Sequence, residues 1–269
     1  MFTKLVITNP SLTIDTSLPE GSGNYPNLLC ENPTYTHCIN SDENLEPGQA
    51  ASAQLVFTVD YSGYSGTQIS KNSVITYYTL QPCDNGVYRQ MGIFRVDEIT
   101  KNRNKYTIVA YDNIIKFDRD VTSFLENSPA TTLYGLFTGL CTYCGVSYYN
   151  SSFHINTNMT VTPKDLIKTG ISGRTVLQYI AQAVGCYAFA RPNGTIHIAV
   201  YGNTLDTPTI AVTDADYEDL DIAELPCPRI TSVAMNNQTE VVYGRGNSSA
   251  EVQIIYNPLF YTRDPSDIQ

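Results

Sequence analysis

Cys141-Thr-Tyr-Cys144 is the spacing in this sequence closest to a known chemistry, because two cysteines three positions apart form a redox pair or half of a zinc site. A zinc site needs a second pair of ligands, and the chain has none with suitable spacing. A redox pair places its first cysteine at a helix start, where the helix dipole lowers the thiol pKa. Both cysteines instead end an apolar stripe with helical spacing. We therefore predict reduced thiols packed in a core, with no disulfide between them.

The histidines do not form a catalytic or metal-binding pattern. His37, His154 and His197 lie far apart in the sequence. His197 alternates with Ile196 and Ile198, which predicts a partly exposed strand residue. The chain also has no G-x-S-x-G nucleophile elbow and no nucleotide-binding glycine motif. A pair of glycosidase carboxylates stays open because such residues pair in space. No catalytic residue, metal or cofactor is predicted.

Acidic residues crowd into residues 214–224. An EF-hand loop counted from Asp214 needs glycine at its sixth position and glutamate at its twelfth, where this chain has Asp219 and Leu225. We interpret the segment as a solvated acidic face, with a weak cation site or an electrostatic role as the alternatives. Its members are Asp214, Asp216, Glu218, Asp219, Asp221 and Glu224.

Composition narrows the class of protein. The 269 residues carry a net charge of −10 without a basic patch, which excludes nucleic-acid binding through a general phosphate-neutralising surface. The 20 tyrosines and the many Asn, Thr and Ser residues favour strands. No apolar run is long enough to span a bilayer, and the first residues do not resemble a signal peptide. We therefore expect a protein made in the cytoplasm, with its seven cysteines reduced.

Strand signals dominate the first part of the chain. Residues 1–54 are punctuated by Pro, Gly, Asn and Ser, and residues 21–27 are predicted to be a loop. Residues 53–59 and 73–80 are predicted strands. Residues 92–111 predict a hairpin that turns at 101–104, with Phe94 and Val96 on one face. Asp112 is then expected to cap a short helix, because its carboxylate can accept from the free amides of the first turn.

The middle of the chain has helical periodicity. The apolar residues of 133–144 recur at helical spacing before Gly145. Ser172 is a suitable N-cap for a second helix that ends at Gly185. An Asn-Gly turn at 193–194 then predicts a hairpin between residues 186–190 and 195–201. Further strands are predicted at 208–212, 230–235, 240–243 and 250–255, and Asp264-Pro265 suggests the start of a helix.

Several of these segments resemble the N-terminal region of phage tail-tip and baseplate hub proteins. The resemblance begins with Gly92-Ile-Phe-Arg-Val-Asp-Glu-Ile and Tyr106-Thr-Ile-Val-Ala-Tyr-Asp112. It continues through Leu140–Val146, Ser172-Gly-Arg-Thr-Val–Cys186 and Arg191-Pro-Asn-Gly-Thr-Ile-His-Ile. It ends with Asp214–Leu220, Pro228–Val233, Tyr243-Gly and Tyr256-Asn-Pro-Leu. The motifs follow the family's order over roughly residues 28–260, although the stretch from Leu29 to Cys38 fits less well and Cys227 is a local difference.

The resemblance implies a non-enzymatic, homotrimeric hub that joins the tail tube to the tip. Two β-barrel-like tube domains in each chain would let three chains match the six-fold ring of the tube. Its partners would be the tail tube or distal tail protein and other tail-tip or baseplate proteins, with DNA passing through without specific binding. The protein would reside in the virion tail. Family members often continue past the Asn-Pro-Leu segment, so this chain is either a short form or a fragment.

The expected fold is α+β and mostly β, with tube-type β-barrel-like domains on either side of an α+β domain. We expect a first β-rich domain at 1–118, an α+β domain at 119–204, and a β segment at 205–269 that starts a second tube-like domain. Part of the acidic segment is expected to face the channel, and a position on the outer wall is the alternative. The acidic residues concerned are Asp214, Asp216, Glu218, Asp219 and Asp221.

Two other classes of function stay open at the level of sequence. A β-rich carbohydrate-binding or adhesin module would suit the many Tyr and Asn residues, since sugars stack on rings and bind amides. The internal pair of helices argues against a plain sandwich of that kind. A cell-wall or cysteine hydrolase would need a nucleophile beside a base, and the isolated histidines give no such signal.

Overall fold

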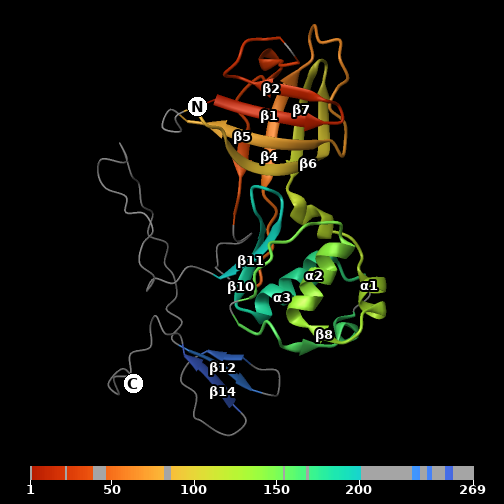
Figure 1. Cartoon of the computed structure of the whole chain (residues 1–269), viewed down its shortest axis with the longest axis vertical. Coiled ribbons are helices and arrows are strands. Elements are labelled where there is room, and N and C mark those ends of the chain that lie inside the picture. Colours follow the sequence, from red (N-terminus) through yellow and green to blue (C-terminus); the bar gives the residue numbers. More distant parts are fainter. Residues whose placement is uncertain are drawn as a thin grey trace, which may run out of the picture. The chain divides into compact units, whose positions relative to one another are not determined.

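The computed structural model describes residues 2–21, 23–38, 47–81, 86–153, 155–167 and 170–200, together with the backbone of three later strands. The chain divides into two compact units, Met1–Tyr201 and Gly202–Gln269. Within the first unit the buried apolar residues form two separate clusters, one in a sheet and one among helices. The elements of this unit are coloured from red to cyan in Figure 1.

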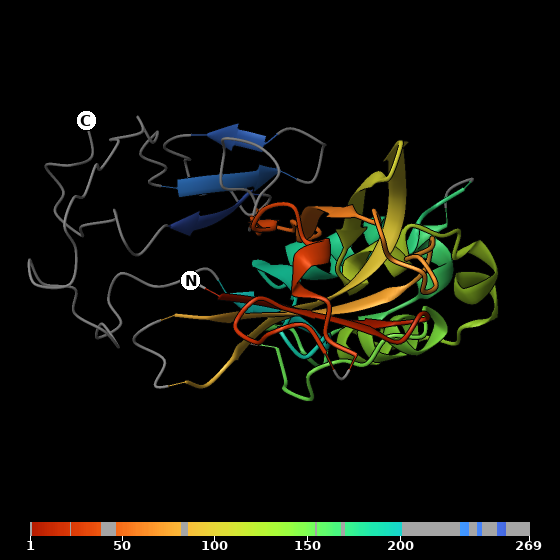
Figure 2. The ribbon, with the colours of Figure 1, turned by 90° about the horizontal axis from the view of Figure 1, so that it is seen from above.

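The sheet of the first unit has seven strands, all paired antiparallel, in the order β2-β1-β5-β6-β7-β4-β3. β1 therefore lies between β2 and β5 (Figure 1), and Figure 2 shows the same unit from above. The strands are β1 (Phe2–Thr8), β2 (Leu12–Asp15), β3 (Thr34–Thr36), β4 (Gln54–Asp60), β5 (Val74–Leu80), β6 (Arg89–Asn102) and β7 (Lys105–Tyr111).

One face of this sheet is buried. Along β4, β5 and β7 every second residue is buried, which is the two-residue period of a strand with one face on a core. Residues from opposite ends of the strand order, such as Leu12 of β2 and Leu55 of β4, belong to the same cluster. The sheet therefore curls around its own core like a barrel, and it stays open between β2 and β3. The predicted α+β, mostly β class is confirmed.

The hairpin predicted in the middle of the sequence is formed by β6 and β7. Phe94 and Val96 are buried, as predicted, and a bulge shifts the register between Val96 and Glu98. The chain then enters a 3-10 helix, η3 (Asn113–Phe117), and the Asp112 carboxylate accepts from the Ile114 backbone N–H at 2.9 Å. The expected cap is confirmed.

The helical part of the unit begins after η3. Its helices are α1 (Thr122–Asn127), α2 (Leu133–Tyr143), η4 (Pro163–Leu166) and α3 (Gly173–Ala183). Its strands are β8 (Thr131–Thr132), β9 (Thr160–Val161), β10 (Cys186–Ala190) and β11 (Ile196–Val200). The Ser172 hydroxyl accepts from the Thr175 N–H, and Gly185 follows α3 with φ +65°. The two predicted helices and the hairpin after them are confirmed.

Two parts of the first unit differ from the sequence-based expectation. β1 and β2 lie in residues for which no strand is predicted, although β1 pairs over its full length with β5. Apolar and polar residues alternate in β1 over a short stretch only, which Asn9-Pro10 ends. The pairing with β5 is therefore what identifies β1 as a strand. α1 is also absent from the prediction, because its six residues are too few for a helical period.

The second unit contains a three-stranded antiparallel sheet in the order β13-β12-β14. Its strands are β12 (Ser232–Asn236), β13 (Val241–Tyr243) and β14 (Val252–Tyr256). They coincide with three of the predicted strands. The predicted strand at 208–212 and the helix start at Asp264 lie outside the described residues. Among the helices that are described, none has the length and apolarity needed to cross a membrane.

Candidate functional site

The two cores of the first unit meet where β4 begins and β7 ends, and a buried carboxylate holds this junction. Asp112 is only 4% exposed, and its Oδ2 atom accepts from the Ala53 N–H at 2.9 Å. Its other oxygen caps η3. Desolvation raises the pKa of Asp112 to about 6, against the opposing effects of the two backbone hydrogen bonds and of Arg174. One side chain thus fixes both the entry of β4 and the exit of β7.

Arg174, at the start of α3, makes the second contact across this junction. Its Nη1 atom donates to the Ala50 carbonyl at 2.9 Å, and Nη2 donates to the Ser52 hydroxyl at 2.8 Å. Its Nε and Nη2 atoms bind the two carboxylate oxygens of Asp118. The planar guanidinium can satisfy three groups in fixed directions, which a lysine cannot do. Arg174 therefore joins α3 to the segment before β4 and to the segment after η3.

The β10–β11 hairpin adds backbone contacts on the same side of the unit. The Gly48 N–H donates to the Cys186 carbonyl, and the Ala188 N–H donates to the Gln49 carbonyl, both at 2.8 Å. Gly48 has φ +96°, and a Cβ there would lie 2.8 Å from the Cβ of Gln182. Only glycine fits this position without displacing α3. Side-chain and backbone contacts together make the junction a fixed connection.

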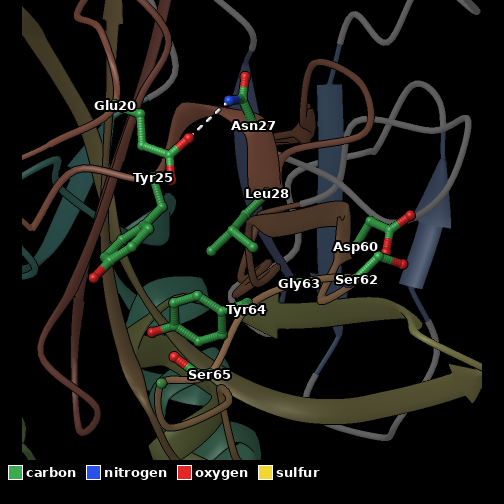
Figure 3. A pocket seen from close by; sticks show the side chains of 10 residues that line it. Glu20, Tyr25, Asn27, Leu28, Asp60, Ser62, Gly63, Tyr64 and Ser65 are labelled. Carbon is green, nitrogen blue, oxygen red and sulfur yellow. Dashed lines mark hydrogen bonds between the residues drawn. The ribbon is translucent and has the colours of Figure 1, made fainter.

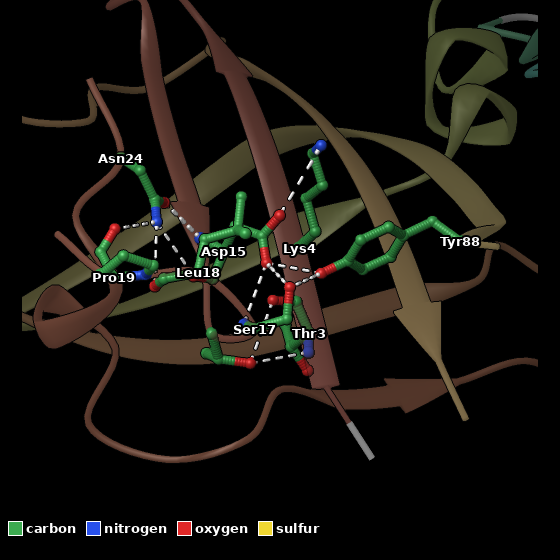
Figure 4. A network of polar contacts seen from close by, with 9 residues as sticks. Thr3, Lys4, Asp15, Ser17, Leu18, Pro19, Asn24 and Tyr88 are labelled. Atoms are coloured by element: carbon green, nitrogen blue, oxygen red, sulfur yellow. Dashed lines mark hydrogen bonds and ion pairs between the residues drawn. The ribbon is translucent and has the colours of Figure 1, made fainter. Parts of the chain in front are cut away.

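A second buried carboxylate lies on β2, away from the junction (Figure 4). The Oδ1 atom of Asp15 accepts from the Ser17 N–H at 3.0 Å, from the Ser17 hydroxyl at 2.8 Å and from the Tyr88 hydroxyl. The Lys4 ammonium is 3.7 Å from Oδ2. Burial alone would raise the pKa of Asp15, but these hydrogen bonds outweigh it and lower the pKa. The network ties the end of β2 to the chain that leads into β6.

The cysteines behave as packed side chains. Cys141, Cys144 and Cys186 are buried free thiols, as predicted. Burial raises the pKa of Cys141 above its ordinary value, and it raises that of Cys144 to about 11. A nucleophilic thiol needs the opposite shift. The other described cysteines, Cys30 and Cys38, are exposed and free.

The histidines lie among aromatic rings rather than beside a nucleophile. The His197 ring contacts Tyr149 edge-on at 4.9 Å between centroids and Phe189 in a tilted arrangement at 5.5 Å, and His197 is half-buried on β11 as predicted. Burial, with a contribution from Arg191, lowers the pKa of His197. His37 packs against Phe189 from the other side at 6.2 Å. Within the described ranges no three His, Cys, Asp or Glu residues are placed to hold a metal.

The acidic residues predicted to face a channel lie outside the described residues. Their orientation therefore stays a prediction. The residues concerned in the acidic segment are Asp214, Asp216, Glu218, Asp219 and Asp221.

Sequence reasoning identified Asp112 as a helix cap but missed its bond to Ala53, and it missed the role of Arg174 altogether. The partners of Arg174 lie 56, 122 and 124 residues away, so no local period indicates them. The available signal was an arginine in the first turn of a helix, where a cation is unfavourable to the helix dipole. A residue placed against a local preference is a reason to look for a distant partner.

Comparisons with known proteins give a distant likeness to solved structures. No protein-family model matches the chain, and no curated protein matches it. Among the solved structures that match is the 43 kDa tail protein of prophage MuSo2 from Shewanella oneidensis, at a TM-score of 0.48 and 12% sequence identity. The match covers 74% of this chain and 54% of that protein, so this chain spans about half its length. A likeness of this size does not define what this chain does.

Proposed function

We propose that this chain is a structural protein of a phage tail or a related injection machine, acting as a hub that joins the tail tube to the tip. The proposal rests first on the ordered series of motifs that resemble the hub family. It rests further on what the residues in those motifs do.

The observation that carries the proposal is the position of Asp112 and Arg174. Asp112 ends the Ala-Tyr-Asp motif, and Arg174 belongs to the Ser-Gly-Arg-Thr motif. Both side chains hold the two cores together, through Ala53 in one case and Ala50 in the other. The motif residues thus fix one part of the chain against another. A subunit that transmits force through a tail needs such fixed internal connections.

The chemistry of the described residues supports a non-enzymatic role. The paired thiols have raised pKa values, and the histidines are in contact with rings. The buried Asp112 has a pKa near the range of a general acid, but both its oxygens accept from backbone N–H groups of the junction. A general acid needs an oxygen free to reach its substrate.

The finer parts of the proposal concern assembly. The chain would act as a homotrimer, with the tail tube or distal tail protein on one side and other tip or baseplate proteins on the other. DNA would pass through the ring without specific binding, and the protein would be a component of the virion tail. The edge strand β3 supports an assembled state, because an open edge needs cover. The edge of β2 is already bonded within the chain, by Asn24 and Tyr25.

Electron microscopy of the purified chain and of the assembled particle tests this proposal. We expect class averages of a closed ring with three-fold symmetry, and antibody against the chain bound at the distal end of the tail. Light scattering should give three times the monomer mass. A monomer at every concentration, together with particles that lack the antigen at the tail tip, would overturn the assignment.

A further inference from the structure

A cavity of about 530 Å³ opens beside the 3-10 helix η1 (Pro26–Leu28), and neither of the buried carboxylates described above lines it. Its walls come from the chain around η1 and from the loop that follows β4. The lining residues are Glu20, Tyr25, Asn27, Leu28, Asp60, Ser62, Gly63, Tyr64, Ser65 and Gly66.

Leu28 and two tyrosine rings form the apolar part of this pocket, and the rest of its lining is mainly polar. The rings of Tyr25 and Tyr64 lie 5.1 Å apart between centroids and are nearly perpendicular, at 84°. Tyr64 is held in turn by Tyr61, whose ring centroid is 5.5 Å away. Figure 3 shows Leu28 beside the two rings, with Glu20 directed toward the same space. A methylene chain would find apolar contact on Leu28 and on the rings.

The charged groups of the pocket are negative. The Glu20 Oε2 atom accepts from the Asn27 side-chain amide at 3.0 Å, so this carboxylate is oriented. The Asp60 Oδ1 atom accepts from the Ser62 N–H at 2.8 Å, and the hydrogen bonds from Ser62 lower the pKa of Asp60. No lysine or arginine is among the lining residues. The charge of Lys105 also lowers the pKa of Asp60. Lys105 lies opposite Asp60 on the neighbouring strand β7 and does not line the pocket.

We propose that this pocket binds an alkylammonium group, with the aliphatic stem on Leu28 and the tyrosine rings and the ammonium at Glu20. Aromatic faces and carboxylates both attract an organic cation, and the combination favours a charged head on an apolar stem. The two sources of this chemistry are a lysine side chain on a partner protein and a free polyamine. A sugar is the competing ligand, because the tyrosine and serine hydroxyl groups of the lining can donate as well as accept.

Calorimetric titration of the full-length chain tests this proposal. The ligands are N-acetyl-lysine methylamide, spermidine, the neutral analogue N-acetyl-norleucine methylamide, and N-acetylglucosamine. We expect saturable binding of one or both amines with a dissociation constant on the order of 1 mM, because the site is partly exposed. Tighter binding of the lysine compound would assign the pocket to a partner's side chain, and tighter binding of spermidine would assign it to a free polyamine.

Glu20→Gln should weaken binding of the amines by about threefold to tenfold, since it removes the charge and keeps the shape. Glu126→Gln, an exposed site on α1 outside the pocket, is the matched control and should leave binding unchanged. Any of four results would overturn the proposal. They are norleucine-analogue binding as tight as that of the amines, binding of the sugar alone, no saturable binding, and an equal loss of affinity in both variants. Circular dichroism of both variants establishes that the fold is kept.

Discussion

At the scale of single residues, two buried carboxylates of the described part of the chain are stabilised in different ways. Asp15 has a lowered pKa because donors from Ser17 and Tyr88 compensate for its burial. Asp112 has a raised pKa because burial outweighs its two backbone donors and Arg174. The balance between desolvation and hydrogen bonding therefore sets the direction in which the pKa of a buried acid shifts.

Tyr88→Phe should destabilise the fold by about 1–2 kcal/mol at neutral pH, because it removes a donor to the Asp15 carboxylate. The ring and its contact with the Lys4 ammonium, 5.2 Å from the ring centre, are kept. Since the folded pKa of Asp15 is depressed, its contribution is present above the unfolded value of about 3.9 and is lost as the pH falls through the folded pKa. In urea unfolding, the free energies of unfolding of Tyr88→Phe and the parent should therefore converge as the pH falls into the acid range.

Tyr143→Phe, on the exposed side of α2, is the control for the loss of a hydroxyl and should match the parent at every pH. A stability gap between Tyr88→Phe and the parent that is constant from neutral pH into acid would show that Asp15 is not the partner that matters.

At the scale of elements, the sequence predicts those helices and strands that local signals determine. α3 has an N-cap, an apolar stripe and a terminal glycine within 14 residues, and β10–β11 has an Asn-Gly turn. β1 has no such signal, since its definition depends on β5, which is about 70 residues away. The bonds of Asp112 and Arg174 across the junction likewise depend on how the cores dock, and periodicity carries no information on docking.

The thiols of α2 should be inert in the native protein. Iodoacetamide should modify Cys30 and Cys38 readily, whereas Cys141 and Cys144 should react only after unfolding, because they are buried and their pKa values are raised. Peptide mapping by mass spectrometry measures this. Cys141→Ala should cost about 1–2 kcal/mol through lost packing. A reductant that lowers the melting temperature would instead reveal a disulfide.

At the junction, Arg174→Lys should destabilise the first unit by about 1–3 kcal/mol, since the ammonium cannot reach the Ala50 carbonyl and Ser52 while binding Asp118. Unfolding in urea should also lose cooperativity, with the sheet and the helical part separating into two transitions. Arg119→Lys, an exposed arginine over the Tyr143 ring, is the control. One sharp transition of unchanged midpoint in Arg174→Lys would mean that the cores are joined by other contacts.

At the scale of the whole molecule, net charge bears on the proposed role as a DNA conduit. The chain carries a net charge of −10, and carboxylates that face a channel repel the phosphate backbone and leave it free to slide. This effect depends on which carboxylates face the channel. It applies most directly to the acidic segment, whose orientation toward the channel is part of the proposed function.

Replacing Asp214, Asp216 and Glu218 with lysine should make the assembled protein bind DNA, with an affinity that falls steeply as salt is raised. The control replaces Glu31, Glu98 and Glu126 with lysine. These residues are exposed, and the three substitutions change the net charge by the same amount. Electrophoretic mobility shifts at several salt concentrations measure the binding, and light scattering checks that the oligomer is unchanged. If the segment lines the channel, particles carrying the first variant should also eject DNA slowly, while the control ejects at the normal rate. Equal DNA binding by both variants, or normal ejection from the first, would place these acids away from the path of the DNA, and the hub proposal would then rest on the ordered motifs and the junction.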